Sequence, residues 1–334
     1  MSEAERNSAA QPGRVSMAQV AARARVSAQT VSRVANDSPR VDPVTRQRVE
    51  QAMIELGYRP NRAARALRTG RTQTLGLVAQ TLATVGNSRM LQAVADAASA
   101  RGYALAVVTL GEDGDIARAF DRLHDQGVDG AIVLNEATVL ARDVAAAGIR
   151  LVVVDSPPDA RFAVVATDHA AGARAATDRL LAAGHRAVHH LAGPEESFAA
   201  SERERGWREA LADAGIEAPE ILRGDWSATS GHAQTQRMLA SAKTMSALFA
   251  ANDQMALGAL RALAEAGLRV PEDVAVIGFD DVADAAEYRP PLTTVRQDFD
   301  TLGEAAVQSV IALIDGETPD DLRLVPTLIA RESA

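Results

Sequence analysis

The chain of 334 residues has no cysteine and a single lysine, Lys243. Without cysteine the protein can form neither disulfides nor thiolate metal sites, and this composition is typical of a reducing compartment. No apolar run approaches the length that spans a bilayer, and residues 1–14 lack the apolar segment of a secretory signal. We therefore expect a cytoplasmic protein that has no contact with a membrane.

Several motifs of enzymes and metalloproteins are also missing. No G-x-G-x-x-G sequence follows an expected strand, which argues against a nicotinamide cofactor. The histidines do not have the spacing of metal ligands. His189 and His190 are neighbours in an expected strand, where alternation directs them to opposite faces. We expect no cofactor, no metal site and no catalytic residue.

Charge is distributed unevenly along the chain. Residues 1–71 contain thirteen arginines and six acidic residues, a balance of +7, and the chain total of −9 leaves −16 for the remainder. A basic head on an acidic body indicates that only the head contacts the phosphates of a nucleic acid. The alternative is that arginine is simply favoured in this composition, since charge asymmetry alone is a weak signal.

The head begins with signals for two short helices. Ser16 and Gln19 fit a capping box, in which each side chain satisfies a backbone N–H group of the other residue. Apolar residues then recur on one face, which predicts a helix over residues 17–24. After a tight connection, Ser27 can cap a second helix whose Val31 and Val34 face inward.

A third helix follows in the head. Asp42 and Pro43 read as its N-cap and first residue, and Gly57 supplies the position after its last turn. Three short helices, of which the first two are joined by a tight turn, predict a helix-turn-helix unit.

The outward face of the second helix has the chemistry that reads base edges. A glutamine such as Gln29 can bond to adenine N6 and N7, and an arginine such as Arg33 can bond to guanine O6 and N7. A solvated polar helix face is the alternative for such residues taken singly. The candidate DNA-contacting residues of this segment are Ser27, Ala28, Gln29, Thr30, Ser32 and Arg33.

The run VSAQTVSRV at residues 26–34, followed by GYRPN at residues 57–61, closely resembles the lactose-repressor (LacI/GalR) family of bacterial transcriptional regulators. The resemblance implies a helix-turn-helix domain over residues 15–60, preceded by a disordered arm over residues 1–14. Its partner would be double-stranded, pseudo-palindromic operator DNA. One departure is Arg25, where many members have glycine; if the turn needs a positive φ, arginine costs roughly 1 kcal/mol there.

Residues 61–72 resemble the hinge helix and linker of the family. The resemblance implies that the hinge orders on DNA and pairs with its dimer mate in the minor groove, where Leu67 intercalates and bends the operator. It places Asn61, Arg62 and Arg65 at the DNA, the arginines near phosphates. A helix of two turns is marginal by itself in water. The alternative for Leu67 is ordinary docking against the body.

The body, residues 73–334, alternates short apolar runs with amphipathic helical stretches. Expected strands are residues 75–79, 103–108, 131–134, 151–154, 188–191, 248–250, 274–279 and 327–329. The helices between them close at Gly102, Gly127, Gly148, Gly184, Gly215 and Gly267. This rhythm predicts parallel sheets covered by helices on both faces. It restarts after Asp155, so we expect two interleaved, doubly wound α/β subdomains with a cleft between them, the periplasmic-binding-protein-like body of the family.

Polar residues follow several of these strands, where open α/β sheets bind ligands. Asp155, Asn252 and Asp280 stand at the ends of three strands, and Trp226 lies in a loop. Taken alone these positions are weak signals, because aspartate and asparagine at strand ends often only cap the next helix.

The resemblance is closest in the C-terminal half of the chain, and it implies an effector site there. The residues that match the family's sugar contacts are Asp155, Arg203, Trp226, Asn252, Asp280, Gln297 and Phe299. Carboxylate, guanidinium and amide groups can bridge hydroxyls, while an aromatic face covers the C–H side of a pyranose. A galactoside is the first candidate effector, and a non-galactoside sugar or a nucleobase is the alternative.

The resemblance fades in residues 77–150. There the positions that form an apolar wall in the family carry Gln80, Thr84, Val85, Asn87 and Met90, which leaves room for another sugar or aglycone. The chain ends shortly after residues 327–329, without the leucine-rich coil that makes tetramers in one member of the family. We therefore expect a homodimer.

Two other classes of protein are alternatives to a regulator. Asp155 and Asp280 in a sugar cleft could be the acid and base of a glycosidase, but nothing in the sequence indicates that one of them has a raised pKa. An extracytoplasmic sugar-binding protein could share the body, yet it would have a signal sequence and no helix-turn-helix. We expect a transcriptional repressor that a sugar inducer releases from DNA.

Overall fold

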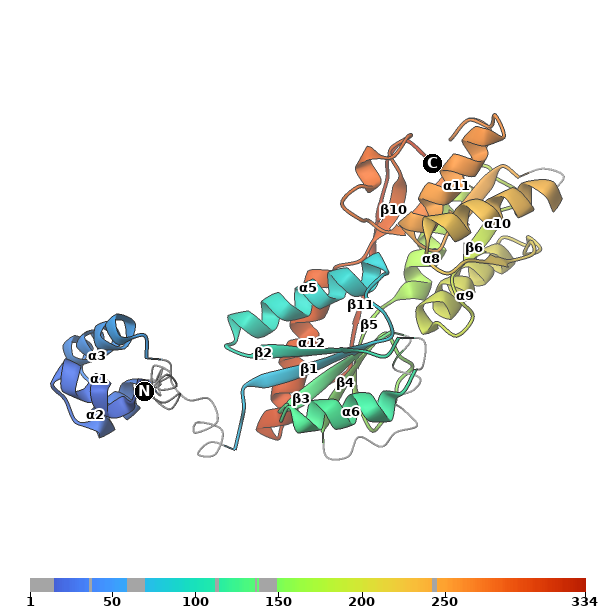
Figure 1. Cartoon of the computed structure of the whole chain (residues 1–334). Coiled ribbons are helices and arrows are strands. Elements are labelled where there is room, and N and C mark those ends of the chain that lie inside the picture. The colour runs from blue at the N-terminus through green and yellow to red at the C-terminus, as the bar shows by residue number, and fades with distance from the viewer. Residues whose placement is uncertain are drawn as a thin grey trace, which may run out of the picture. The chain divides into compact units, whose positions relative to one another are not determined.

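The computed structural model describes residues 15–35, 38–58, 70–111, 114–135, 137, 149–241 and 245–334. The chain divides into two compact units, Met1–Thr72 and Gln73–Ala334 (Figure 1). The described part of the chain contains no helix long and apolar enough to cross a membrane.

The smaller unit contains the three predicted helices α1 (Met17–Ala24), α2 (Ala28–Ala35) and α3 (Pro43–Leu56). The predicted caps are confirmed: Ser16 and Gln19 form the capping box of α1, and Asp42 accepts a hydrogen bond from the backbone N–H of Thr45 at the start of α3. Val20, Val31 and Val49, one from each helix, are fully buried in a common core.

The tight turn between α1 and α2 passes through Arg25, which has φ 54° and ψ 47°. This is the left-handed conformation that the sequence left open, and arginine bears a cost of roughly 1 kcal/mol there relative to glycine. The turn is closed by a hydrogen bond of 3.0 Å from the backbone N–H of Val26 to the carbonyl of Ala21. The helix-turn-helix geometry therefore forms without glycine.

The larger unit contains two six-stranded sheets. The first has the order β11-β5-β4-β3-β1-β2 and is parallel throughout. Its strands are β1 (Thr74–Ala79), β2 (Ala104–Thr109), β3 (Gly130–Leu134), β4 (Arg150–Val154), β5 (Ala163–Thr167) and β11 (Leu322–Leu324). Helices α5 (Val85–Ala100) and α12 (Phe299–Asp315) pack together against one face, and α6 (Ile116–Asp125) contributes to the core on the other.

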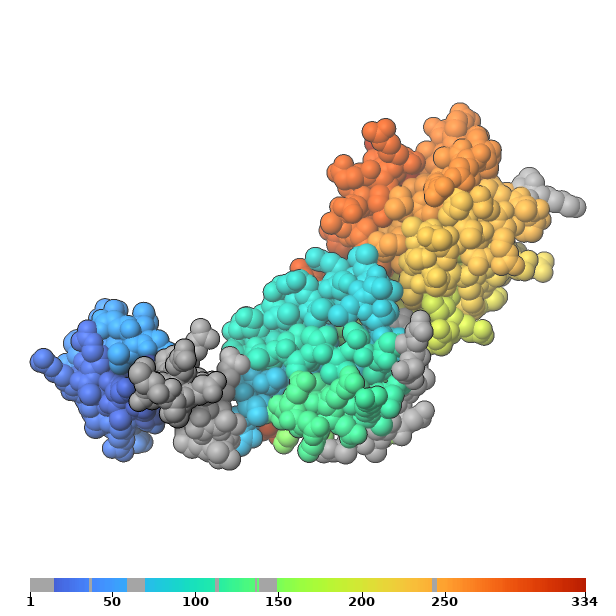
Figure 2. Space-filling view, viewed as in Figure 1, coloured from blue at the N-terminus to red at the C-terminus, as the bar shows by residue number. Residues whose placement is uncertain are grey.

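The second sheet has the order β12-β10-β9-β8-β6-β7, in which only β12 runs antiparallel to its neighbour. Its strands are β6 (His189–Ala192), β7 (Leu222–Arg223), β8 (Ala247–Ala250), β9 (Ala275–Asp280), β10 (Thr293–Arg296) and β12 (Thr327–Ile329). Its helices are α8 (His169–Ala182), α9 (Phe198–Asp213), α10 (Ala228–Ser241), α11 (Asp253–Glu265) and the 3-10 turn η2 (Ala285–Glu287). The two sheets and their helices form the two lobes seen in Figure 2.

All eight predicted strands are confirmed to within one residue at each end. The predicted helix ends at Gly102, Gly127, Gly184, Gly215 and Gly267 are confirmed by their positive φ angles, and Gly148 lies outside the described residues. Four strands were not predicted: β5, β7, β10 and β11. Three of them have only two to four residues, too few for a period to show, and β5 follows the proline-rich segment after Asp155.

The expectation that the second subdomain begins after Asp155 was wrong. Strand β5 follows that residue and still pairs with β4 in the first sheet, and the second sheet takes its first strand only at β6. The chain then crosses between the subdomains three times: from β5 to α8, from β10 to α12, and from β11 to β12. The two subdomains are therefore interleaved, as the sequence predicted, and three connections run between the two lobes.

Candidate functional site

A cavity of about 50 Å³ lies between the two subdomains of the larger unit. All seven residues that the sequence singled out as effector contacts line it, although they come from six different parts of the chain. These residues are Asp155, Arg203, Trp226, Asn252, Asp280, Gln297 and Phe299. Asp155 directly follows strand β4 of the first subdomain, and Arg203 lies on helix α9 of the second. Gln297 and Phe299 lie where the chain crosses from β10 to α12, so both subdomains contribute to one site.

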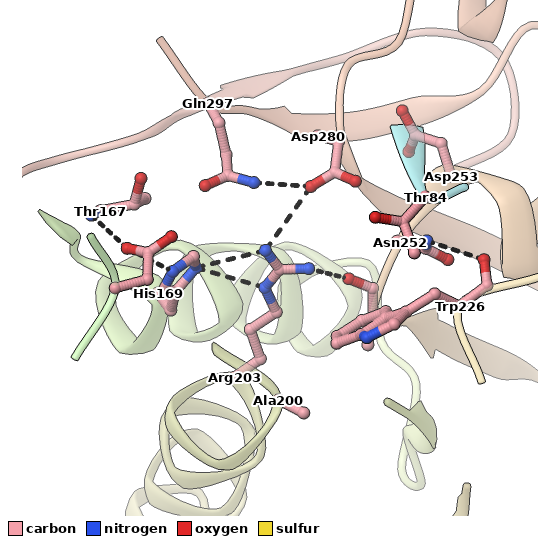
Figure 3. Close-up of polar contacts among 12 residues, drawn as sticks. Thr84, Thr167, His169, Ala200, Arg203, Trp226, Asn252, Asp253, Asp280 and Gln297 are labelled. Atoms are coloured by element: carbon pink, nitrogen blue, oxygen red, sulfur yellow. Dashed lines mark hydrogen bonds and ion pairs between the residues drawn. The ribbon is translucent and has the colours of Figure 1, made fainter. Parts of the chain in front are cut away.

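Arg203 is at the centre of the polar contacts (Figure 3). Its guanidinium is buried, with Nη2 3.5 Å from Asp280 Oδ1, and Nη1 donates to the carbonyl of Ala251. The Cζ atom lies 3.8 Å from the ring centroid of Phe279 and 5.5 Å from that of Trp226. Aromatic rings and hydrogen-bond acceptors together hold the guanidinium in one orientation.

Asp155 reaches the cavity from the carboxyl end of β4. Its backbone has φ 53°, and its Oδ1 accepts a hydrogen bond of 2.9 Å from the backbone N–H of Thr167. Burial raises the pKa of this carboxyl, but nearby His169 and the Thr167 amide outweigh burial and hold the pKa below its usual value. Asp155 is therefore ionised, and it acts as a hydrogen-bond acceptor.

Asp280 reaches the cavity from the end of β9 in the other subdomain. Its Oδ1 accepts a hydrogen bond of 2.6 Å from Gln297 Nε2, and its backbone has the unusual φ of 112°. Burial raises the pKa of Asp280 although Arg203 and Gln297 act to lower it. The sequence had indicated no carboxyl of raised pKa, so this finding corrects that interpretation: burial depends on the packing of distant segments.

Asn252 and Trp226 form a second cluster in the cavity. Asn252 caps α11 by accepting a hydrogen bond of 2.9 Å from the backbone N–H of Met255. The indole of Trp226 packs over Gly193, where a Cβ would lie 2.3 Å from the ring. Asn252 thus has both roles that the sequence left open, helix cap and cavity residue.

Asp253, the first residue of α11, lies near Asp280. Its Oδ1 accepts from Thr294 Oγ1 at 2.6 Å, and its Oδ2 accepts from the backbone N–H of Val282 at 2.9 Å. Burial, together with repulsion from Asp280, raises the pKa of Asp253 to about 8. The hydrogen bond to Val282 restrains the segment that follows β9 and so helps to fix the position of Asp280.

The first subdomain adds three polar residues to a lining that also contains Met90, Val154 and Leu302, in the segment where the sequence departs from the apolar wall of the family. Thr84, Asn87 and Asn135 all line the cavity. Asn87 is buried, donates to the carbonyl of Thr81 at 2.9 Å and accepts a hydrogen bond from Asn135. Asn135 directly follows β3, so the rule that pointed to Asp155 could have found it.

His169 was missed as well, because it follows β5, a strand that the sequence did not predict. It is buried beside Asp155 and Arg203 and does not border the cavity. The ring of Phe279, which stacks on Arg203, was also missed. An apolar residue within a strand gives no signal in the sequence that separates it from ordinary core.

In the smaller unit, the candidate DNA-contacting residues lie on and before α2. Ser27 caps the helix by accepting a hydrogen bond of 3.1 Å from the backbone N–H of Thr30. Ala28, Gln29 and Arg33 are exposed, and Thr30 and Ser32 are half-buried. Asn61, Arg62, Arg65 and Leu67 of the predicted hinge lie outside the described residues, as do residues 1–14.

Comparisons with known proteins match both units. The family described as "Bacterial regulatory proteins, lacI family" matches residues 16–61, and the family described as "Periplasmic binding protein-like domain" matches residues 177–334. The lactose operon repressor of Escherichia coli K12 is 36% identical over 322 residues, which cover 95% of this chain and 89% of that protein. The regulator CelR of Thermobifida fusca is 39% identical over 334 residues, which cover 96% and 98%.

Solved structures show the same likeness. The lac repressor dimer bound to operator and the anti-inducer ONPF has a TM-score of 0.85 at 36% identity and matches 96% of this chain and 98% of that chain. A complex of the transcriptional regulator CelR with cellobiose has a TM-score of 0.71 at 37% identity and matches 96% of this chain and 100% of that chain.

Proposed function

The chain belongs to the lacI family of bacterial regulatory proteins, as a DNA-binding transcriptional repressor with an effector-binding domain, and from this premise we propose that a sugar controls its affinity for the operator. The sugar binds in the cavity between the subdomains and acts as an inducer. The single observation that carries this proposal is the convergence of seven polar and aromatic residues from both subdomains on one cavity.

The cavity has the chemistry of a sugar site. Asp155 and Asp280 offer carboxylate oxygens, Arg203 and Asn252 offer donors, and Trp226 offers an aromatic face for the C–H side of a pyranose. The buried Oε1 of Gln297 has no hydrogen-bond partner among the described residues. A buried acceptor without a partner is costly, and a ligand hydroxyl would satisfy it.

A galactoside is the first candidate effector, on the resemblance of these residues to the family's sugar contacts. A glucoside such as cellobiose is the second candidate, and one observation favours it: Thr84, Asn87 and Asn135 place polar groups in the first-subdomain wall, beside the apolar Met90, Val154 and Leu302. Amides and hydroxyls there suit a second sugar ring better than an apolar aglycone. The relative CelR was solved with cellobiose. A nucleobase stacked on Trp226 is the third candidate.

Binding at this cavity can act on DNA only if the sugar contacts the two states of the protein differently. A ligand held by Asp155 of one subdomain and Arg203 of the other meets that condition, since rotation of the lobes changes both contacts together. The cavity of about 50 Å³ is small for a pyranose. Movement of the lobes or of the lining side chains on binding is the signal that we propose.

The proposed DNA interface consists of α2 and the hinge. Gln29 and Arg33 read base edges from the exposed face of α2, while Arg62 and Arg65 contact phosphates and Asn61 lies beside them. Leu67 intercalates in the minor groove at the centre of a pseudo-palindromic operator. In a dimer, the lobe rotation separates the two hinges, and helices of two turns do not persist unpaired. A coupling of about 1–3 kcal/mol weakens operator binding about 5–150-fold.

The dimer surface that we propose lies on exposed apolar residues of the larger unit. Val107 on the edge strand β2 and Leu257 on α11 are both exposed. An edge strand presents unpaired backbone groups, which makes an exposed apolar side chain on it a candidate for contact with a second chain. A second copy of the chain is the partner that a pseudo-palindromic site requires.

A hydrolytic role has less support. The raised pKa of Asp280 suits a general acid, but its Oδ1 is held by Gln297 and lies close to Arg203, and the relatives are regulators.

The decisive experiment selects an operator from random DNA with the full chain and then titrates the complex with lactose, cellobiose, galactose and adenine by fluorescence anisotropy. Release by a sugar supports the proposal. Operator binding that all four leave unchanged, or hydrolysis of nitrophenyl glycosides, would overturn it.

A further inference from the structure

The guanidinium of Arg203 directs two of its N–H groups at a single atom. Both Nε and Nη2 lie 3.3 Å from Nδ1 of His169, and both side chains are buried. An arginine in a protein is always protonated and can only donate. Nδ1 must therefore carry a lone pair, and in a neutral imidazole the proton is then on Nε2.

The other ring nitrogen of His169 faces the first subdomain. Its Nε2 lies 3.0 Å from Oδ1 of Asp155, although the two are not aligned as a hydrogen bond in this arrangement. The same Oδ1 accepts the 2.9 Å hydrogen bond from the backbone N–H of Thr167. A buried N–H group this close to an ionised carboxylate needs only a small rotation of the ring to bond with it.

His169 lies where the chain passes from the first subdomain into the second. The residue is the first of α8, directly after the chain crosses from the first subdomain into the second. Its ring centroid lies 5.9 Å from that of Phe279, the ring on which Arg203 stacks. One imidazole thus lies between the carboxylate that ends β4 and the guanidinium of α9.

We infer that His169 is a positioning residue of the effector site. Its Nδ1 holds the Arg203 guanidinium against Phe279 and beside Trp226, and its Nε2–H faces Asp155. Asp155 and Arg203, the two residues that contact the effector, are thus linked through one imidazole ring. The inference rests on the proposed function, because it is the effector that contacts Asp155 and Arg203. Without the ring nitrogen, the buried Nε and Nη2 groups of Arg203 lose one shared acceptor, and the guanidinium is held less firmly against Phe279.

A matched pair of variants separates this role from packing. His169→Asn keeps an acceptor close to the position of Nδ1, whereas His169→Leu fills the space and has no acceptor. The readout is the fluorescence of Trp226, which lies 5.5 Å from Arg203. We expect His169→Leu to shift the emission and to increase quenching by acrylamide, and His169→Asn to resemble the parent. The other tryptophan, Trp207, is fully buried, so the difference between the pair should vanish in a Trp226→Phe background.

The proton itself is observed by NMR of the full chain with ¹⁵N-labelled histidine. His169, identified by the signal that His169→Asn removes, should show an unprotonated Nδ1 and a protonated Nε2, and Asp155→Asn should move the Nε2 signal. A proton on Nδ1 would overturn the inference, as would parent-like fluorescence of a folded His169→Leu. If that variant does not fold, the NMR result on the parent still decides. Neither measurement needs an effector or DNA, so failure here is distinguishable from failure of the proposed function.

Discussion

The side-chain amide of Asn252 donates a hydrogen bond of 3.0 Å to the main-chain carbonyl of Trp226, a residue held at φ 73°. The same side chain caps α11 through its oxygen. A bulky residue rarely adopts a left-handed conformation unless its surroundings impose it. Asn252 therefore joins the stability of a helix end to the orientation of the aromatic face in the cavity.

This relationship makes Asn252 a test of both roles. Asn252→Ala should lower the free energy of unfolding by about 1–2 kcal/mol through loss of the cap, and it should also alter Trp226 fluorescence. Asn252→Asp keeps the capping oxygen and loses the donor, so it should change the fluorescence with a smaller loss of stability. Denaturant unfolding followed by fluorescence measures both. Equal losses of stability in the two variants, or parent-like Trp226 fluorescence in Asn252→Asp, would contradict the division of roles.

Asp280 is the residue whose loss should separate effector response from DNA binding. Asp280→Asn removes the carboxylate that faces Arg203, so the sugar that releases the parent from operator should no longer do so, while operator affinity stays within about twofold, or 0.4 kcal/mol. Asp273→Asn is the matched control, because Asp273 pairs with Arg269 on the surface of the same subdomain. Anisotropy titrations compare the three proteins. Release of Asp280→Asn at the parent's sugar concentration would show that the pocket is wrongly assigned.

Arg33 should determine one operator position. Arg33→Ala removes an exposed guanidinium from α2, which should cost roughly 1–3 kcal/mol of operator binding and relax the base preference at one site in each half. Arg48→Ala, which removes another arginine from the head, on α3, should leave the preference unchanged. Binding-site selection with each variant measures this. A selected sequence identical to that of the parent would exclude Arg33 as a base reader.

Leu67, outside the described residues, should bend the operator. Leu67→Ala removes the apolar wedge, so specific affinity and bending should fall while weak binding to random DNA, which is electrostatic, remains. A gel phasing assay measures the bend and competition with random DNA measures specificity. Leu67→Met, which keeps an apolar side chain of similar length, should bend as the parent does. Equal bending by the alanine variant would reject the wedge.

His190 should make the larger unit sensitive to acid. It stacks on Phe249 at 4.8 Å within the core, and burial lowers its pKa to about 4. As the pH falls below about 6.5, His190 binds a proton in the unfolded chain but not in the folded chain. The free energy of unfolding is therefore unaffected above that pH and decreases towards pH 4. The loss should reach about 3 kcal/mol at pH 4. Urea unfolding at pH 7 and pH 4 measures it, and His190→Phe should lose less between the two; an equal loss would assign the acid sensitivity to other groups.

The sequence by itself determined the features that depend on neighbouring residues. The capping box of Ser16 and Gln19, the cap at Asp42 and the glycines that end helices are local, because the groups that satisfy each other lie within a few residues. The alternation of strands and helices in the body and the positions of Asp155, Asn252 and Asp280 at strand ends follow from local periodicity as well. Resemblance to the family supplied Arg203, Gln297 and Phe299, which stand at no strand end that local patterns mark.

Tertiary structure alone decided what those residues do together. The sheet position of β5 depends on its pairing with β4, and with it the place of His169 between Asp155 and Arg203. The raised pKa values of Asp253 and Asp280 depend on burial by segments far apart in the chain. The amide pair of Asn87 and Asn135 joins residues 48 positions apart. Such contacts form only when loops close around a common core, and no local pattern in the chain records which distant group will be the partner.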